Sequence, residues 1–261
     1  MTIPRLLSPL QNEASAQGRC AFAIMTKAPR AGHVKTRLTP PLSAEESAAL
    51  NRAFLRDLSA AITASGEPGQ GIACFTPAGS REVYYDLLPA GFLMIPQREG
   101  DLSARLIGAV DDLFSIGFRA VCLLNSDSPT VLASSFADAA RFLSGPDDCL
   151  VLGPSDDGGY YLIGMNQPHP QLFEGIDWST DRVLSQTRAR ADAFGVRVQV
   201  LPSCFDVDDK DTLHRLCEDL FGPNETEGRP RAPSTRQFLA QIINREGRTR
   251  IWPHDSAETG A

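Results

Sequence analysis

The sequence predicts an α/β protein whose doubly wound, mostly parallel sheet is flanked by helices. Short apolar runs of strand length alternate with amphipathic stretches of helical length between residues 20 and 220. Two of the runs, 20–26 (CAFAIMT) and 120–125 (AVCLLN), are apolar on both faces, as central strands covered by helices are. Polar residues follow several of the runs directly, at the strand ends where such sheets bind ligands.

The first half of the chain begins with the strand at 20–26. Ser43 then opens a helix, because Glu46 three positions later completes a capping box, and apolar residues repeat at helical spacing as far as Ile62. The pattern further predicts a strand at 71–76, a short helix near 81–88, a strand at 92–95 and a helix at 102–114.

The second half begins with the central strand at 120–125. Helices are predicted at 134–143, from a cap at Thr180 to about Phe194, and at 209–220. Strands are predicted at 149–153, 160–164 and 196–201. We therefore expect a flexible tail over 1–18, one α/β domain over 19–222, and a linker with a C-terminal extension over 223–261.

Composition narrows the class of protein. The formal net charge is −7, so we expect no nucleic acid as partner. No apolar stretch approaches the roughly 20 residues of a membrane span. Six cysteines without a C-x-x-C pair indicate reduced thiols in a cytoplasmic protein, and four scattered histidines argue against a zinc site. Nothing in the sequence indicates an oligomeric state.

A basic loop follows the first strand. It places Lys27, Arg30, Lys35 and Arg37 within eleven positions, together with Gly32, in a chain that is acidic as a whole. Crowded like charges favour an anionic partner, and phosphate groups suit both the guanidinium fork and the ammonium group. The alternative is a solvated basic loop. The Walker motif is absent, so a phosphate site here would be of another kind.

Two acidic segments follow later strands. Asp127 stands in NSDSP after the strand at 120–125, where it could hold Mg²⁺ or Mn²⁺ or cap the next helix. In DVDDKD after the last strand, alternation places Asp206 and Asp208 on one face. We assign the metal role to Asp208 and a helix-capping role to Asp209.

Three further segments carry candidate contacts. In SDDGGYY, Asp157 with its two following glycines forms either a hairpin turn or a substrate site whose carboxylate receives or activates a hydroxyl. QREGD at 97–101 and WST at 178–180 could contact a ligand or only enter a helix.

In this order, KAPRAGHVKTRL, QREGDLSARL, LNSDSP, LGPSDDGGYYLIG, WST and DVDDKDTL resemble a bacterial family of uncharacterised GT-A-fold proteins. These are described as glycosyltransferase-like and are linked by name to arsenosugar biosynthesis. The resemblance covers about residues 20–220. The basic loop and the aspartates at strand ends are also similar to those of 2-phospholactate guanylyltransferases and, more distantly, of molybdenum-cofactor guanylyltransferases and sugar-nucleotide cytidylyltransferases.

The resemblance implies a GT-A fold, similar to nucleotide-diphospho-sugar transferases, and a role for each matching residue. Lys27, Lys35 and Arg37 would cradle the nucleotide phosphates, and Asp127 and Asp208 would hold the metal. The nucleotide base or ribose would lie near Gly100 and Asp101, and the acceptor near Asp157, Gly158, Gly159 and Trp178. Catalysis would fall to Asp127, Lys35 and Asp157.

The expected function is metal-dependent glycosyl transfer from a nucleotide-sugar to a small acceptor. The alternatives are nucleotidylyl transfer, in which pyrophosphate leaves onto Lys35 and Arg37, and nucleotide binding without catalysis. Two departures from the resembling families matter. Ser126-Asp127-Ser128 offers one carboxylate where sugar transferases have D-x-D. Asp209-Lys210 stands where relatives commonly have Thr-Pro after the last aspartate.

Overall fold

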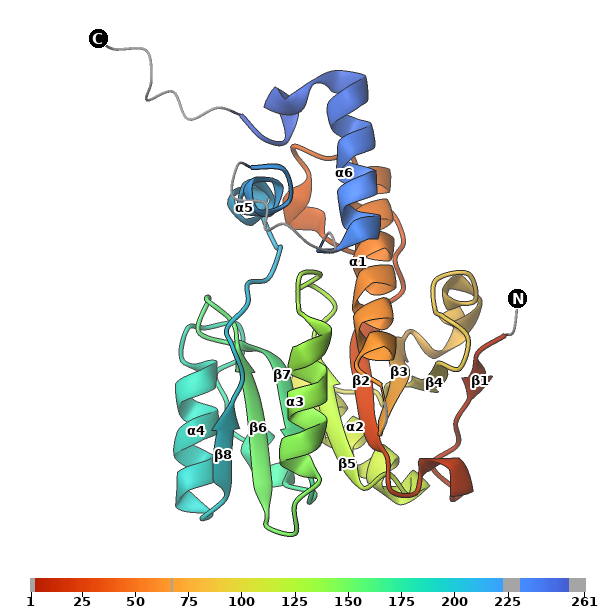
Figure 1. Ribbon diagram of the computed structural model, residues 1–261, viewed down its shortest axis with the longest axis vertical. Coiled ribbons are helices and arrows are strands. Elements are labelled where there is room, and N and C mark those ends of the chain that lie inside the picture. Colours follow the sequence, from red (N-terminus) through yellow and green to blue (C-terminus); the bar gives the residue numbers. More distant parts are fainter. Residues whose placement is uncertain (1–2, 67, 223–230, 254–261) are drawn as a thin grey trace.

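The computed structural model describes residues 3–66, 68–222 and 231–253, and its core is one eight-stranded sheet (Figure 1). The strand order is β1-β4-β3-β2-β5-β7-β6-β8. Every pair is parallel except the two that β7 makes with β5 and β6. The strands are β1 (Arg5–Leu6), β2 (Cys20–Lys27), β3 (Gly69–Thr76), β4 (Leu93–Pro96), β5 (Ala120–Leu124), β6 (Cys149–Pro154), β7 (Tyr160–Met165) and β8 (Arg197–Val200).

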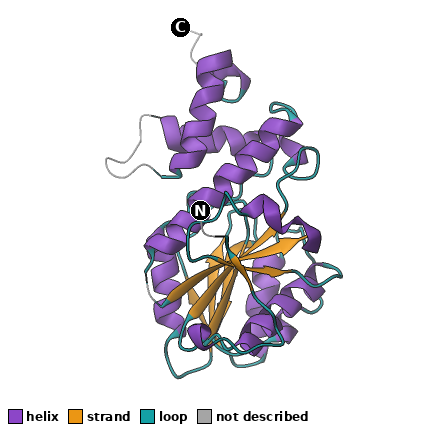
Figure 2. Ribbon diagram, turned by 90° about the vertical axis from the view of Figure 1, so that its right-hand side faces the viewer, coloured by secondary structure: helices purple, strands orange, loops and turns teal. Residues whose placement is uncertain are grey.

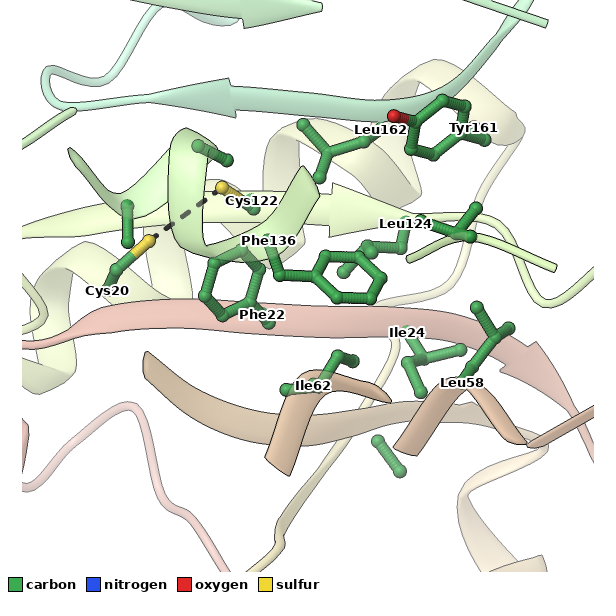
Figure 3. Packing of buried hydrophobic residues seen from close by; sticks show 14 of the residues in the cluster. Cys20, Phe22, Ile24, Leu58, Ile62, Cys122, Leu124, Phe136, Tyr161 and Leu162 are labelled. Atoms are coloured by element: carbon green, nitrogen blue, oxygen red, sulfur yellow. Dashed lines mark hydrogen bonds between the residues drawn. The ribbon is translucent and has the colours of Figure 1, made fainter. Parts of the chain in front are cut away.

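Helices cover both faces of the sheet, which confirms the predicted fold class (Figure 2). Phe22 and Ile24 point to one face, where Phe22 contacts Phe136 with ring centroids 5.5 Å apart (Figure 3). Ala21 and Ala23 point to the other face. The first face packs against α1 (Ala44–Ala64) and α3 (Ala133–Leu143), and the second against α2 (Leu102–Ile116) and α4 (Val183–Ala193).

Two helices begin at the caps that the sequence predicted, and a third does not. Ser43 and Glu46 form the predicted capping box at α1. Asp209 caps α5 (Lys210–Phe221) by accepting from the Thr212 amide at 2.9 Å, as predicted. The predicted cap at Thr180 is wrong: α4 begins at Val183 with Arg182 as its N-cap, while the Thr180 hydroxyl donates to the Asp177 carbonyl at 2.7 Å and accepts from the Arg182 amide at 3.3 Å.

The N-terminal segment lies along the sheet edge, whereas a flexible tail was expected over 1–18. β1 pairs with β4, and the amide of Leu7 donates to the carbonyl of Met94 at 2.7 Å. Leu7 and Ala16 are buried. An exposed strand edge offers unpaired backbone groups, and this segment satisfies some of those on β4. Residues 1 and 2 lie outside the described residues.

A second layer of helices stands above the carboxyl ends of the strands. We call α5 and α6 (Pro233–Glu246), with the first half of α1, the α5–α6 region; it has its own apolar core (Figure 1). Asp57 of α1 accepts the amides of Ser234 and Thr235 at 2.8 Å each, so it caps the start of α6. The expected C-terminal extension is thus packed on the domain, while 223–230 and 254–261 lie outside the described residues.

Short 3-10 helices complete the chain: η1 (Ala14–Ala16), η2 (Thr36–Leu38), η3 (Ala78–Tyr84), η4 (Pro170–Phe173) and η5 (Arg248–Arg250). None of the helices in the three described ranges combines the length and the apolar character that crossing a membrane requires. All six cysteines are free thiols, and Cys20 Sγ lies 3.7 Å from Cys122 Sγ in the core (Figure 3).

Candidate functional site

Two cavities lie beyond the carboxyl ends of the central strands, and they share Ser126 and Asp127 in their walls. The first, which we call the basic cavity, has a volume of about 240 Å³. Its lining is Lys27, His33, Val34, Lys35, Thr36, Arg37, Asn51, Ser126, Asp127 and Asp208. The second, the aromatic cavity, has a volume of about 350 Å³ and is lined mainly by α2, β5, β7 and the segment 178–183.

The basic loop between β2 and α1 brings its cations to the first cavity. Gly32 has a φ of +74°, a left-handed conformation that glycine adopts without strain. Lys35 also has a left-handed backbone, with φ 49° and ψ 38°. For a residue with a Cβ this conformation costs on the order of 1–2 kcal/mol, so contacts of the Lys35 side chain must hold it there.

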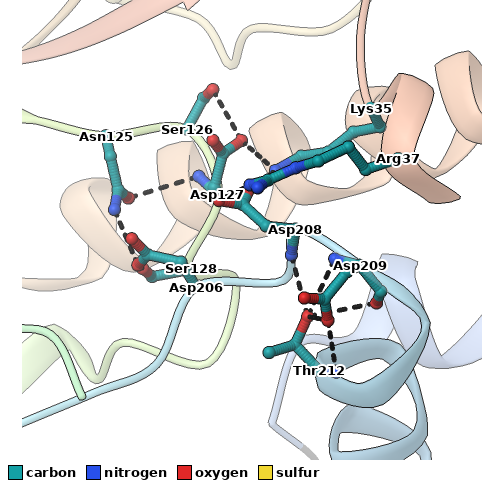
Figure 4. Close-up of polar contacts among 10 residues, drawn as sticks. All are labelled: Lys35, Arg37, Asn125, Ser126, Asp127, Ser128, Asp206, Asp208, Asp209 and Thr212. Carbon is teal, nitrogen blue, oxygen red and sulfur yellow. Dashed lines mark hydrogen bonds and ion pairs between the residues drawn. The ribbon is translucent and has the colours of Figure 1, made fainter. Parts of the chain in front are cut away.

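Those contacts are the carboxylates of Asp127 and Asp208 (Figure 4). The Lys35 Nζ lies 2.7 Å from Asp127 Oδ1 and 2.9 Å from Asp208 Oδ1, and the side chain is only 5% exposed. Burial alone would lower the pKa of Lys35, but the two carboxylates outweigh it and hold this pKa above its ordinary value. The ammonium group therefore stays charged and draws both carboxylates to one point.

Arg37 approaches the same pair from the outside. Its guanidinium donates to Asp208 Oδ2 at 2.9 Å, and its side chain is 69% exposed. The structure thus brings together Lys27, Lys35, Arg37, Asp127 and Asp208, as the sequence predicted. Arg30 is exposed and is not among the residues that line either cavity.

The end of β5 holds Asp127 in place without using it as a helix cap. Its carbonyl accepts from the Val207 amide at 3.0 Å, and its amide donates to Asn125 Oδ1 at 3.2 Å. The N-cap of α3 is Leu132, so neither Asp127 nor Ser128 caps that helix. The carboxylate of Asp127 consequently faces the two cavities, where it pairs with Lys35.

Asp206, which the sequence placed beside Asp208 without a role, lies behind Asp127 in the wall of the aromatic cavity. Its Oδ1 accepts from Asn125 Nδ2 at 2.8 Å and from the Ser128 hydroxyl (Figure 4). Burial raises the pKa of Asp206, and these two hydrogen bonds only partly offset the effect. Asp206 thereby ties the segment after β5 to the segment before α5.

Asp157 and Trp178 face the aromatic cavity from β6–β7 and from the segment before α4. Asp157 Oδ1 accepts from the Gly159 amide at 2.9 Å, so the expected tight turn is present and its carboxylate also borders the cavity. Gly158, at φ +86°, is required by space, since a Cβ there would lie 2.3 Å from the Asp181 carbonyl oxygen. Trp178 Nε1 donates to Ser103 Oγ at 2.8 Å, which fixes the indole ring.

Gly100 and Asp101 belong to the start of α2 and line neither cavity. Asp101 Oδ1 accepts from the Ala104 amide at 2.8 Å, which makes Asp101 the N-cap of α2. Of the two alternatives that the sequence left open for this segment, the start of a helix is therefore present. Leu102 and Leu106 of the same helix do line the aromatic cavity.

Asn51 is a cavity residue that the sequence analysis did not identify. This residue of α1 is 3% exposed, lines the basic cavity, and its Oδ1 has no hydrogen-bond partner within the described part of the chain. Buried polar atoms are nearly always paired, so an unpaired one beside a cavity makes Asn51 a candidate for contacting a ligand. Its only signal in the sequence is a polar side chain beside Leu50, in the apolar pattern of the helix.

The described residues contain no group of three or more His, Cys, Asp or Glu side chains placed to hold a metal ion. The basic cavity offers two carboxylates, Asp127 and Asp208. Mg²⁺ and Mn²⁺ prefer oxygen ligands, and Mg²⁺ is commonly held by one or two carboxylates together with substrate phosphates and water.

Comparison with known proteins places the fold. A bacterial family described as an uncharacterized protein conserved in bacteria matches residues 60–180. A provisionally named nucleotide-diphospho-sugar transferase from Desulfovibrio desulfuricans G20 is 27% identical, with a TM-score of 0.76 over 87% of this chain and 96% of its own. No curated protein is significantly similar in sequence.

Two further structures are more distantly similar. A 4-diphosphocytidyl-2C-methyl-D-erythritol synthase from Anaerococcus prevotii is 10% identical, with a TM-score of 0.48 over 75% of this chain and 95% of its own. A mannosyltransferase from Pyrobaculum calidifontis, solved with GDP-Man and Mn²⁺, is 12% identical, with a TM-score of 0.45 over 94% of this chain and 79% of its own.

Proposed function

We propose that this protein is a metal-dependent transferase that moves a glycosyl group from a nucleotide-diphosphate sugar to a small acceptor. The observation that carries the proposal is the meeting of a basic cavity and an aromatic cavity at Asp127. The similarity to the D. desulfuricans protein over most of both chains supports it. We assign the activity to residues 19–222.

The basic cavity would receive the diphosphate of the donor. Lys27, Lys35 and Arg37 would contact its oxygens, and the unpaired amide of Asn51 would accept from the ligand or, with its side chain turned over, donate to it. When the sugar bond breaks, negative charge grows on the departing diphosphate. Fixed cations stabilise this charge in the transition state, which is usually the largest single catalytic contribution.

The two carboxylates of the basic cavity fit a divalent cation. Asp127 Oδ1 and Asp208 Oδ1 already converge on one positive centre, the Nζ of Lys35. We propose that Asp127 and Asp208 would hold Mg²⁺ or Mn²⁺, with Lys35 turning from them toward the phosphates. Such an ion would neutralise phosphate charge and polarise the departing oxygen.

The aromatic cavity would receive the acceptor beside Asp157, Gly158, Gly159 and Trp178. The acceptor oxygen forms a bond to the anomeric carbon, the bond from that carbon to the diphosphate breaks, and the hydroxyl proton passes to Asp157. No ion pair within the described residues engages the Asp157 carboxylate, which leaves it available as a base.

A second candidate is nucleotidylyl transfer to a phosphorylated acceptor, and the number of cations in the loop favours it, since a triphosphate carries more charge than a diphosphate. Thermal-shift measurements with NDP-sugars and NTPs, with and without Mg²⁺ or Mn²⁺, separate the two because ligands that bind the folded state stabilise it. We expect stabilisation by an NDP-sugar with metal, and slow release of NDP. Release of pyrophosphate from an NTP with no NDP from any sugar nucleotide would contradict glycosyl transfer.

A further inference from the structure

The aromatic cavity differs from the basic cavity in the charge of its lining. Its apolar and aromatic lining residues are Met25, Leu102, Leu106, Leu123, Leu124, Tyr160, Tyr161, Ile163, Trp178 and Val183. The rest are Gly159, four neutral polar residues (Asn125, Ser126, Ser179 and Thr180) and three acids (Asp127, Asp157 and Asp206). No Lys, Arg or His occurs among the lining residues that the structure describes.

The three acids contribute unequally to the field in this cavity. The negative charge of Asp127 is compensated by Lys35, whose ammonium group lies 2.7 Å away on the side of the basic cavity. Asp206 is half-buried, and its Oδ1 accepts from Asn125 Nδ2 and from the Ser128 hydroxyl. Asp157 is exposed, and within the described part of the chain its carboxylate accepts one hydrogen bond, from the amide of Gly159 at 2.9 Å. Its charge therefore faces the cavity without a compensating cation within the described residues.

We propose that the aromatic cavity selects its acceptor by charge: a small hydroxyl-bearing molecule with an apolar face, cationic in preference to neutral, and without phosphate. This proposal rests on the proposed function, since it names the acceptor of that transfer.

The physical reason is the charge of the Asp157 carboxylate, which repels a phosphate group and attracts an ammonium group. A phosphate carries about −1.5 to −2 charges near neutral pH and would approach Asp157 without a cation to receive it. An ammonium group would instead gain the attraction of that carboxylate and of the aromatic faces of the lining. The apolar side chains of α2 and β5 would cover the remaining, uncharged face of the acceptor.

An acceptor site that disfavours phosphate also separates the two candidate reactions, because nucleotidylyl transfer needs a phosphorylated acceptor. Such an acceptor would have to place its phosphate among carboxylates in the aromatic cavity, while every lysine and arginine of the site lines the other cavity.

The two tryptophans allow this cavity to be observed directly. Trp178 lines it, and Trp252 packs against Phe221 in the α5–α6 region, so Trp252→Phe leaves Trp178 as the single reporter. We would titrate this variant with three probes of one skeleton: 2-amino-1-phenylethanol, 1-phenylethane-1,2-diol and 2-hydroxy-2-phenylethyl phosphate. We expect the amine to quench Trp178 fluorescence at about fivefold lower concentration than the diol, and the phosphate to be the weakest by a similar factor.

Asp157→Asn tests the source of this preference. The amide retains the oxygen that accepts from Gly159 and removes only the charge, so the turn should persist while the preference for the amine over the diol largely disappears. Asp181→Asn is the matched control. Asp181 is an exposed acid near the same turn that does not line the cavity, and its replacement should leave the order of the probes unchanged.

Equal or tighter binding of the phosphate probe, equal binding of all three, or no quenching by any of them would overturn the proposal. If Trp252→Phe does not fold, the wild-type protein labelled with 5-fluorotryptophan gives the same readout by fluorine NMR. Titration of the same samples with NDP-sugars and Mn²⁺ keeps the two proposals distinguishable. Loss of amine preference with intact NDP-sugar binding rejects only the acceptor class, whereas intact preference without NDP-sugar binding rejects the transferase.

Discussion

The basic and aromatic cavities are neighbours with opposite chemistry. The basic cavity is built from a loop and from Asp208 at the entrance to the α5–α6 region, whereas the aromatic cavity is built largely from the ends of strands and from α2. Asp127 belongs to both, and Lys35 compensates its charge on one side only. The difference shows how the carboxyl ends of the strands in one sheet can present a cationic and an anionic surface side by side, with the carboxylate of Asp127 at the boundary.

The largest effect is expected from the residue that the two cavities share. Asp127→Asn removes one of the two carboxylates proposed to hold the metal, and metal-dependent transfer should fall by about 100-fold or more, on the scale of a lost catalytic electrostatic contact. The melting temperature should fall by only a few degrees, because Lys35 retains Asp208 as a partner. Activity and thermal unfolding would be measured on the same preparation. Wild-type activity combined with a large loss of stability would make Asp127 a structural residue.

A smaller effect, confined to the basic cavity, is expected from Lys35→Ala. Nucleotide affinity should weaken by roughly 1–3 kcal/mol, the scale of a lost charge-assisted hydrogen bond. Mn²⁺ alone should bind more tightly than to the wild type, since the ammonium group no longer occupies the space between Asp127 and Asp208. Calorimetry measures both quantities. Unchanged affinity for both ligands would show that the cation of the loop does not face the ligand.

Arg37→Ala removes the same formal charge as Lys35→Ala from a far more exposed side chain. Solvent screens an exposed charge, so we expect a loss of nucleotide affinity of about 0.5–1 kcal/mol and no gain in Mn²⁺ affinity. The salt dependence of nucleotide binding should also decrease. A loss larger than that of Lys35→Ala would reverse the order of the two cations.

The smallest effect on either cavity is expected from Glu46, which lines neither of them and pairs with Arg245 and Arg250 at the start of α1. Burial would raise the pKa of Glu46, but bonds from Arg250 and from the Ser43 amide outweigh it and hold the pKa below its ordinary value. A carboxyl group with a lowered pKa stabilises the fold above its unfolded pKa, and this contribution is lost as the pH falls through the lowered value. Glu46→Gln should therefore cost about 1 kcal/mol at pH 7 and progressively less toward pH 3.

Urea unfolding of the wild type and of Glu46→Gln across that pH range measures the difference. A cost that stays constant with pH would mean that the charge of Glu46 does not contribute. Binding of the amine probe to the aromatic cavity should be the same in both proteins, because Glu46 lies in the α5–α6 region.

The sheet and the convergence of the basic loop with Asp127 and Asp208 could be predicted from the sequence. Buried parallel strands are read directly as continuous apolar runs, and the polar residues that follow neighbouring strands must meet at one edge of the sheet. The caps of α1 and α5 were also predictable, because capping is decided within four residues of the chain.

The remaining features depend on contacts between distant segments. The two-residue strand β1 carries no periodicity, and the docking of α6 depends on Asp57, about 180 residues earlier. Asn51 belongs to no motif, and only the folded structure shows that its amide is buried beside a cavity. The contrast in charge between the two cavities likewise follows from residues of many elements, none of which is distinctive alone.

The central claim is that the basic cavity binds the nucleotide and the aromatic cavity binds the acceptor. Its most direct test is calorimetry with each of the four common nucleoside diphosphates in the presence of Mn²⁺. Wild type, Lys35→Ala and Asp157→Asn would be compared, one charge being removed from each cavity in turn. We expect at least one diphosphate to bind the wild type, to bind Lys35→Ala markedly less tightly, and to bind Asp157→Asn with unchanged affinity. Weakened binding to Asp157→Asn together with unchanged binding to Lys35→Ala would place the nucleotide in the aromatic cavity and contradict the account.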